Sequence, residues 1–228
     1  MAADHSSAGL SSSLTDLMTS LAVIFILLLV ASLNNAQQEG AETRTEIREE
    51  LKRALNQYTK LEVSDDPKDP LGLVVLIPEE LLQFEKNKDE VPLKGKDFLK
   101  KFVPILSSTV CGDRFEKMIH SVVVEGHTDS DGDDELNLKL SQSRSMSVIR
   151  LSLEVLRDPG LHQLYLPFLN LISASGRGEL DLIHDKSGSE DMPRSRRVVF
   201  KIRVRSLEQR PLGEALGGMM SVEASRKP

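Results

Sequence analysis

The chain has 228 residues, a formal net charge of −6 and a single cysteine. A length of this order suits one compact domain with linkers and a membrane segment. The acidic balance argues against a protein that mainly binds nucleic acid, because neutralising phosphate groups requires a basic surface. Cys111 has no second cysteine to pair with, which excludes an intramolecular disulfide and a cysteine-based metal site.

Residues 14–34 form the most apolar block, and after Asp16 they contain no charge, proline or glycine. The block has about the 20 residues that a membrane-spanning helix needs. A secretory signal begins with a positively charged segment, whereas residues 1–13 contain no Lys or Arg. We therefore expect an uncleaved transmembrane helix over 14–34. The small residues at 31–36 leave cleavage as the alternative.

Asp16 lies at the start of this apolar run, and Thr19 and Ser20 follow at a spacing that puts all three on one helix face. A carboxylate beside hydrocarbon is costly unless it is protonated, paired or hydrated, so it can take up and release a proton. A charge that crosses the membrane potential gains about 2.3 kcal/mol per 100 mV. The alternative is an interfacial aspartate that only caps the helix N-terminus, where negative charge is favoured.

Residues 35–70 are predicted to be a polar, helical linker. Ile47, Leu51 and Leu55 recur in it at helical spacing. Two interpretations fit this stripe: a solvated amphipathic spacer, or a helix that pairs two copies of the chain. Residues 64–70 are rich in Asp and Pro and are expected to form the domain boundary.

Strands and helices alternate through residues 71–206, which predicts one α/β (α+β) domain with helices packed on a sheet face. The expected strands are 71–77, 121–125 and 198–205, and the expected helices are 94–106 and 141–156, the latter with Met146, Ile149, Leu153 and Leu156 on one stripe. Residues 156–172 suggest an added helix over the sheet, with a partner surface as the alternative. Residues 207–228 are expected to be a flexible tail.

A dense motif lies between the second strand and its helix. It comprises Gly126, His127, Thr128, Asp129, Gly132, Asn137, Leu140, Ser141 and Arg144. Asp129 would end the strand at a turn, and Arg144 would lie in the first turn of a helix begun by Ser141. A carboxylate and a guanidinium across a cleft, beside helix amides, suit a zwitterionic ligand. The alternative is an Asp129–Arg144 salt bridge that only joins turn to helix.

The sequence gives weaker support to other kinds of site. The acidic residues after the strand resemble part of a calcium loop, but Gly132 is fourth from Asp129, whereas an EF-hand needs glycine sixth. His127 has no evident nucleophile to activate and is expected to pack within the turn. We expect no metal, no cofactor and no enzymatic activity.

The residues Asp16-Leu17-Met18-Thr19 and the apolar run after them resemble the membrane helix of MotB-type stator proteins. In that family an Asp-x-Met-Thr stretch carries the proton-accepting aspartate. The resemblance implies that Asp16 carries protons, with Thr19 and Ser20 in support. It also implies a homodimer inside a ring of MotA-like multi-span membrane subunits.

The motif from Gly126 to Arg144 resembles the OmpA-like peptidoglycan-binding domain that MotB carries at its C-terminus. Residues 176–179 and 196–198 are similar to later elements of that family, with Ser195 where the family usually has Asn. The resemblance implies an OmpA-like sandwich of helices on a mixed sheet. It implies a peptidoglycan site, in which the zwitterionic end of a diaminopimelate stem peptide is bound, formed by Asp129, Asn137, Leu140, Arg144 and Arg197.

Together the two resemblances imply a single-pass protein of the bacterial inner membrane, with residues 1–13 in the cytoplasm and the C-terminal domain in the periplasm. Charge alone weakly favours the reverse, because the Lys and Arg residues follow the span. The short N-terminus without flanking basic residues favours the stators of Zorya anti-phage defence, whose ZorB component has this layout, over a flagellar stator. The alternative function is a passive tether between membrane and peptidoglycan.

Overall fold

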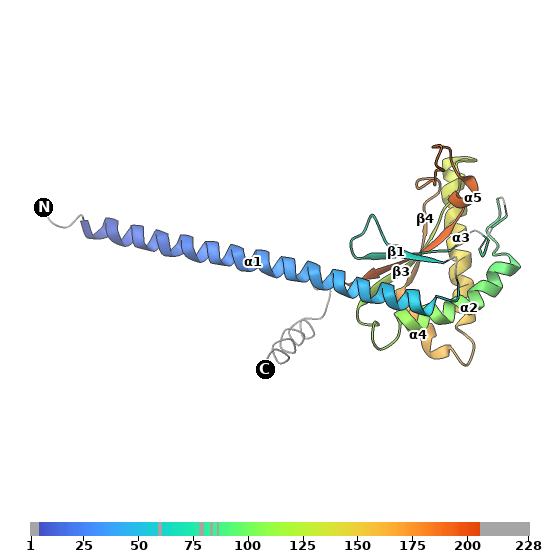
Figure 1. Ribbon diagram of the computed structural model, residues 1–228, viewed down its shortest axis with the longest axis horizontal. Coiled ribbons are helices and arrows are strands. Elements are labelled where there is room, and N and C mark those ends of the chain that lie inside the picture. Colours follow the sequence, from blue (N-terminus) through green and yellow to red (C-terminus); the bar gives the residue numbers. More distant parts are fainter. Residues whose placement is uncertain (1–4, 59–60, 78–79, 83, 86, 206–228) are drawn as a thin grey trace.

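The computed structural model describes residues 5–58, 61–77, 80–82, 84–85 and 87–205 (Figure 1). The tail expected at 207–228 lies outside these residues. The described elements are α1 (His5–Ala54), β1 (Glu62–Asp65), β2 (Gly72–Leu76), α2 (Leu93–Val110), β3 (Ile119–Gly126), α3 (Asp134–Val155), α4 (His162–Leu171), β4 (Ile172–Gly176), α5 (Met192–Ser195) and β5 (Val198–Val204).

The strands form one mixed sheet in the order β1-β2-β5-β3-β4. The β3–β4 pair is parallel, and the other pairs are antiparallel. Side chains alternate between the two faces of a strand, so Val122 and Val124 of β3 lie on the same face as their cross-strand partners Ile202 and Phe200 of β5. All four are fully buried. The predicted mixed sheet with helices on its apolar face is confirmed.

One apolar core joins this face of the sheet to the helices. It includes Leu51 of α1, Phe102 of α2, Val148 of α3 and Phe168 of α4, each fully buried. The ring of Phe102 meets Phe200 of β5 edge-on at 5.2 Å between centroids. Burial of this apolar area is the main stabilising contribution to the domain.

The helix α1 is one continuous helix of 50 residues, about 75 Å long at 1.5 Å per residue. Its N-terminal part projects from the domain, and its C-terminal part packs against it (Figure 1). Ile47 and Leu51 are fully buried and Leu55 is 2% exposed. The predicted apolar stripe therefore belongs to the core of its own domain, and neither a solvated spacer nor a free pairing surface describes it.

The sheet begins before residue 71, within the expected linker. Strand β1 pairs with β2, and residues 66–71 connect the two, so the expected boundary at 64–70 is a hairpin connection. Arg48 of α1 pairs with Asp65 of β1 at 2.9 Å, which fastens the helix to the edge of the sheet.

The helix α3 begins at Asp134, seven positions before the predicted start at Ser141. Asp133 caps it, because its carboxylate accepts hydrogen bonds from the backbone N–H groups of Glu135 and Leu136. Arg144 is therefore near the middle of α3, about 15 Å from its N-terminus. The expectation that Arg144 lies in a first turn was wrong, because the helix starts at the acidic residues Asp134 and Glu135 and not at Ser141.

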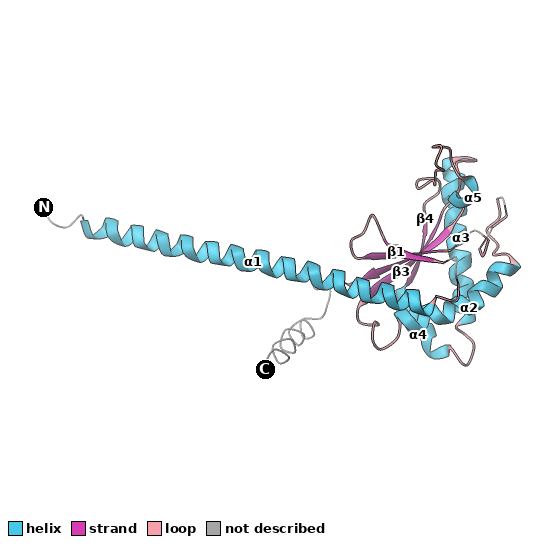
Figure 2. Ribbon diagram, viewed as in Figure 1, coloured by secondary structure: helices cyan, strands magenta, loops and turns pink. Residues whose placement is uncertain are grey.

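The strands β2, β3 and β5 and the helices α2 and α4 lie close to their expected residue ranges, whereas β4 and α5 were not predicted. Figure 2 shows how these helices and strands are arranged. The helix α2 continues past Pro104 to Val110, since its buried stripe continues through Leu106. The added helix is α4, which contacts α2 and β3. Met146 was predicted in the buried stripe of α3 but is 51% exposed. Cys111 is a buried core residue as expected, and burial raises the pKa of its thiol to about 12.

Candidate functional site

The site forms where the parallel strands β3 and β4 end beneath α3. A Cβ atom at Gly126 would lie 2.2 Å from the backbone oxygen of Ser141, and one at Gly176 would lie 2.6 Å from the backbone nitrogen of Gln142. Only glycine permits so close an approach of helix and strand. The hydroxyl of Ser141 also accepts a hydrogen bond of 2.9 Å from the backbone N–H of Gly178. These contacts fix α3 above the loop that follows β3.

Asn137 joins the two loops of the site. Its side-chain amide donates to the backbone oxygen of Asp129 at 3.4 Å and to a carboxylate oxygen of Glu179 at 3.1 Å. The backbone N–H of Thr128 donates to the oxygen of Gly178 at 2.9 Å, so the loops are tied at a second point. Asn137 is 3% exposed, and its hydrogen bonds hold the two loops of the site together.

Asp129 forms its ion pair with Arg196. The guanidinium Nη1 of Arg196 lies 2.5 Å from Oδ2 of Asp129. Arg144 is engaged elsewhere: its Nε donates to the backbone oxygen of Lys88 at 3.0 Å, and its Nη2 donates to that of Glu85 at 3.2 Å. The alternative interpretation, an Asp129–Arg144 salt bridge that joins turn to helix, is therefore not found among the residues that the structure describes.

Arg144 is nevertheless part of the same electrostatic cluster. It is 2% exposed, and its guanidinium lies over the ring of Phe84, 5.1 Å from the centroid. Burial lowers the pKa of Arg144 to about 10, a shift that the negative charge of Asp129 opposes and the positive charge of Arg196 reinforces. Arg144 stays protonated at neutral pH, so the site holds two cations around one carboxylate.

Arg197, expected as the second cation of the site, lies away from Asp129. Its Nη2 donates to the backbone oxygen of Asp181 at 3.0 Å, and its Nη1 donates to that of Ser195 at 3.3 Å. Arg196 is the C-terminal cap of α5 and Arg197 lies between it and β5, and the two side chains reach different acceptors. The arginine pair before β5 signalled a cation, but the sequence did not indicate which of the two would reach Asp129. Leu140, also expected in the site, is half-buried on α3.

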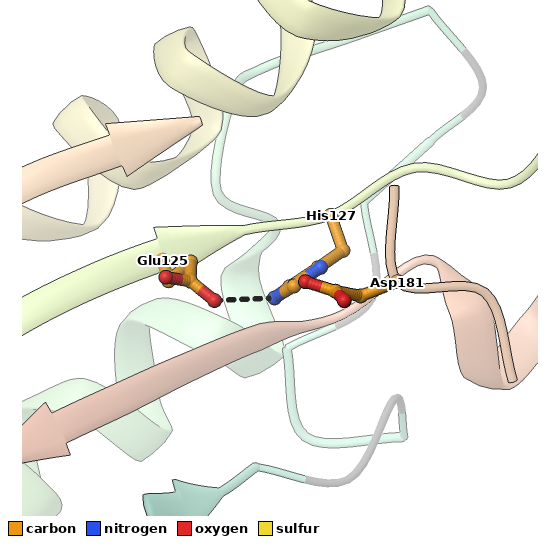
Figure 3. A group of neighbouring side chains, drawn as sticks. All are labelled: Glu125, His127 and Asp181. Carbon is orange, nitrogen blue, oxygen red and sulfur yellow. Dashed lines mark ion pairs between the residues drawn. The ribbon is translucent and has the colours of Figure 1, made fainter. Parts of the chain in front are cut away.

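A second polar cluster lies on the sheet face opposite the helices. Glu125, His127 and Asp181 point toward one another there (Figure 3), and their ligand atoms lie within 4.8 Å of one another. His127 Nε2 is 3.2 Å from a carboxylate oxygen of Glu125. These three side chains line a cavity of about 260 Å³, which Arg197 and Lys201 also border.

The two carboxylates of this cluster are already paired with cations. Lys201 Nζ lies 3.0 Å from Glu125, and Asp181 pairs with Lys68 and with Arg177 Nε at 3.3 Å. A metal ion would have to displace these cations and would be repelled by Arg197 beside them. We therefore interpret the cluster as a network of ion pairs.

The ion pairs shift the pKa values of the buried groups in this network. Burial by itself raises the pKa of Glu125, but His127 and the positive charge of Lys201 outweigh it and lower the pKa to about 2. Burial lowers the pKa of His127, and Arg197 lowers it further, while Glu125 opposes the shift. Glu125 is therefore ionised and His127 is mainly neutral at neutral pH.

Asp16 lies far from both clusters, on the projecting part of α1. Among the described residues, one helix is long and apolar enough to cross a membrane, over Leu14–Asn34 with a mean hydropathy of 2.4. Asp16, Thr19 and Ser20 are exposed on it, and the Thr19 hydroxyl donates to the backbone oxygen of Thr15 at 2.7 Å. The helix extends back to His5, so Asp16 does not cap its N-terminus.

The comparison with known proteins first identifies the fold of the domain. No family model matches the chain. The crystal structure of a MotB-like protein from Desulfovibrio vulgaris superposes with a TM-score of 0.52 at 21% identity, over 74% of this chain and 99% of that one. The domain therefore has the MotB/OmpA-like fold, as the motif predicted.

Two curated proteins are related to the chain in sequence. A Zorya protein ZorB from the Crooks strain of Escherichia coli is 26% identical over 206 residues, which cover 83% of this chain and 86% of the relative. A ZorB from a second Escherichia coli strain is 30% identical over 145 residues, 58% of this chain and 56% of the relative. The chain is a distant homologue of ZorB over most of its length. This relationship supports the expectation that it is not an enzyme.

Proposed function

We propose that this chain is the wall-anchored subunit of an ion-driven motor of the MotB and ZorB type, which crosses the bacterial inner membrane once. The observation that carries the proposal is the continuous helix α1. Near one end it holds Asp16 within an apolar span, and near the other it contributes Ile47 and Leu51 to the core of the domain that bears Asp129. A membrane carboxylate and a ligand site are thus parts of one rigid unit.

Asp16 is proposed to carry protons. Because it is well inside α1, the capping role that would explain an interfacial aspartate does not apply. A carboxylate within a span is costly unless it is protonated or faces protein or water, and such residues mark ion pathways. Thr19 and Ser20 share its helix face and supply hydroxyl groups beside it.

The proposed partners follow from the exposure of the span. Every residue from Leu14 to Asn34 is exposed in the single chain, including Asp16. An ionisable side chain at membrane depth needs protein around it, so we expect two copies of α1 inside a ring of MotA-like multi-span subunits. Protonation of Asp16 would change its contacts with this ring, and the anchored domain would hold the dimer still.

The ligand of the domain is proposed to be peptidoglycan. Asp129 and its neighbouring guanidinium offer one negative and one positive partner, which suit the amine and the carboxylate at the side-chain end of diaminopimelate. Binding to the wall puts the domain in the periplasm and the N-terminus in the cytoplasm. The distant homology to ZorB favours a role in anti-phage defence.

The motor proposal is tested by changing Asp16 in the full chain, expressed with its neighbouring genes in a susceptible host. Asp16→Asn removes the titratable group and should abolish protection against phage, measured as plating efficiency. Asp16→Glu retains a carboxylate and should retain part of the protection. Both variants should insert into the membrane and bind purified sacculi as the wild type does. Full protection by Asp16→Asn would leave a passive tether as the function.

The wall-binding proposal is tested separately with Asp129→Asn. This variant keeps the size of the side chain and removes the charge that would bind the ligand amine. We expect it to lose co-sedimentation with sacculi while its membrane insertion stays normal. Undiminished co-sedimentation would show that the wall is bound elsewhere or not through this carboxylate.

A further inference from the structure

We propose that His127 and the ion pair between Lys68 and Asp181 form an acid-responsive switch that controls a loop beside the proposed wall-binding site. The inference rests on the proposed binding of peptidoglycan and concerns its regulation. In this switch a proton on His127 opens the cavity behind the site, and binding to the wall becomes weaker.

The first argument is the environment of His127. Its side chain is 2% exposed and borders the cavity of about 260 Å³ on the sheet face opposite the helices (Figure 3). Its Nε2 lies 3.2 Å from a carboxylate oxygen of Glu125, whereas its Nδ1 has no hydrogen-bond partner among the residues that the structure describes. A carboxylate oxygen of Asp181 lies within 4.8 Å of the ring. A proton taken up by this imidazole would therefore have two carboxylates beside it.

The second argument is the charge balance of the network around the cavity. Charged groups reach it from the strands, from the hairpin connection and from the loops on both sides. The anions are Glu62, Asp66, Glu125 and Asp181, and the cations are Lys68, Arg177, Arg197 and Lys201. Four negative charges thus meet four positive charges while His127 is neutral. Protonation of His127 adds a buried positive charge without a counterion, which is costly unless water reaches it.

The ion pair of Lys68 with Asp181, here called the latch, joins two segments that border the cavity. Lys68 belongs to the hairpin connection 66–71, and Asp181 belongs to the loop 177–184 that follows β4. The side chain of Lys68 is 61% exposed, and an ion pair so exposed contributes little to stability. A protonated His127 would compete with Lys68 for Asp181, and the ammonium group of Lys68 would return to water. The latch can therefore open without disturbing the apolar core.

When the latch opens, the loop 177–184 is the segment that is released. The hairpin connection stays attached to α1, because Nη1 of Arg44 donates a hydrogen bond to the backbone oxygen of Pro70. It also stays attached to the sheet, since it joins β1 to β2. The loop 177–184 has no such connection to α1 among the contacts of the described residues.

The loop 177–184 holds the proposed wall-binding site in place through two hydrogen bonds. The backbone oxygen of Gly178 accepts from the N–H of Thr128 at 2.9 Å. A carboxylate oxygen of Glu179 accepts from the side-chain amide of Asn137 at 3.1 Å. Displacement of the loop would loosen both contacts, and the site would lose the geometry in which it binds its ligand.

The direction of the pH dependence follows from the burial of His127. In the closed arrangement, burial and the charge of Arg197 lower the pKa of His127 below its ordinary value of 6.5, and Glu125 opposes this shift. In the open arrangement water hydrates the ring and returns the pKa toward the ordinary value. The open arrangement therefore binds the proton more strongly, and acid favours it below pH 6.5. Neutral pH favours the closed arrangement and strong binding to the wall.

The experiment measures the affinity of the full-length protein, in detergent micelles, for purified sacculi by co-sedimentation between about pH 7.5 and about pH 5. The wild type should bind about fivefold more weakly at the acidic end. His127→Gln keeps a polar side chain but takes up no proton, so its affinity should stay constant over this range. His184→Gln is the matched control, because His184 is exposed in the same loop, and it should follow the wild type.

Lys68→Gln tests the latch without changing a buried residue. It lacks the latch at every pH, so its affinity near pH 7.5 should already equal that of the wild type near pH 5 and change little further. Hydrogen exchange gives a readout that does not depend on the wall. Protection of the Thr128 amide, which donates to Gly178, should fall in acid in the wild type and stay constant in His127→Gln.

A wild-type affinity that is constant over this pH range would overturn the inference. So would a His127→Gln or Lys68→Gln variant that keeps the full pH dependence of the wild type. If His127→Gln does not fold, Lys68→Gln decides the matter. A wild type that binds no sacculi at any pH would refute peptidoglycan binding itself. In that case the exchange of Thr128 still tests the switch, and protection that does not depend on pH would overturn it.

Discussion

Glu125 keeps a buried negative charge because the cation of Lys201 and the imidazole of His127 lie beside it. It lies between His127 and Lys201 on the face of the sheet opposite the helices, and Lys201 also approaches Asp66 at 3.5 Å. Breaking a buried pair by removing one partner leaves a charge without compensation. This network lies directly behind the loop of Asp129, so its protonation state affects the stability of the site.

The low pKa of Glu125 predicts loss of stability in acid. Its folded-state pKa of about 2 lies below the ordinary value of 4.5, so its stabilising contribution is complete above pH 4.5 and disappears as the pH falls toward 2. The contribution is about 3 kcal/mol. Thermal unfolding at pH values from 7 to 2 should show Glu125→Gln less stable than wild type at pH 7, with this part of the acid sensitivity gone.

The control for this prediction is Glu116→Gln, because Glu116 is exposed. It should follow the wild-type curve. An acid transition of Glu125→Gln parallel to that of the wild type would show that other carboxylates cause it.

At the scale of elements, the crossing of α3 over β3 and β4 shapes the site. The crossing depends on two glycines, Gly126 and Gly176, which leave room for the backbone of Ser141 and Gln142. Every loop residue of the site is positioned relative to this crossing. A displacement of α3 would therefore change the distance from Asn137 to both loops at once.

We predict that Gly126→Ala disrupts both stability and wall binding. The new Cβ would lie 2.2 Å from a backbone oxygen, which the helix can relieve only by moving away. Overpacking of this kind costs about 3 kcal/mol or more, measured as the free energy of unfolding in urea. Gly160→Ala is the control, because its nearest neighbour is a side-chain oxygen at 3.4 Å. Equal stability of the two variants would contradict the close crossing.

The sequence predicted those parts of the site that depend on local spacing. The motif from Gly126 to Asn137 identified the loop and its carboxylate, because glycines and turn-forming residues indicate the local backbone conformation directly. The start of α3 was missed although Asp133, followed by two acidic residues, is a helix-start signal. The choice between Arg196 and Arg197 depends on where the loops of Asp129 and Asp181 lie beside the segment between α5 and β5, and that is a tertiary property.

The difference between local spacing and tertiary contacts also explains why the position of the apolar stripe of α1 was not predicted. Periodicity indicated that Ile47 and Leu51 share one apolar face. It does not indicate what that face contacts, since solvent beside a spacer, a second copy and the chain's own domain are all compatible with the same pattern. The core of the domain covers it here, because the C-terminal part of α1 packs against α2 and against the strands β1, β2 and β5.

At the scale of the whole molecule, the span and the domain are joined by uninterrupted helix. The span ends at Asn34, and Gly40 is already buried against the domain, so about 9 Å of helix separates them. Each residue inserted into this segment would rotate the span relative to the domain by about 100° and move it by about 1.5 Å.

This geometry predicts that function depends on helical phase. Two alanines inserted between Gln37 and Gln38 turn Asp16 by about 200° and should abolish protection against phage. Seven inserted alanines turn Asp16 by about 700°, which is about 20° short of two full turns. They should therefore restore part of the protection despite the longer helix. Membrane level and sacculus binding should be equal in both variants. Equal protection by the two insertions would indicate a flexible joint.

The absence of a joint in the described part of α1 has a mechanical meaning. A helix that is both membrane span and core element transmits torsion directly, because twisting one end without the other would break backbone hydrogen bonds or unpack Leu51. In the proposed assembly, any angular motion between the membrane partners and the wall would occur at the two proposed contacts, around Asp16 and at Asp129. The span and the domain would then move as one rigid unit, which can rotate relative to its partners at its two ends.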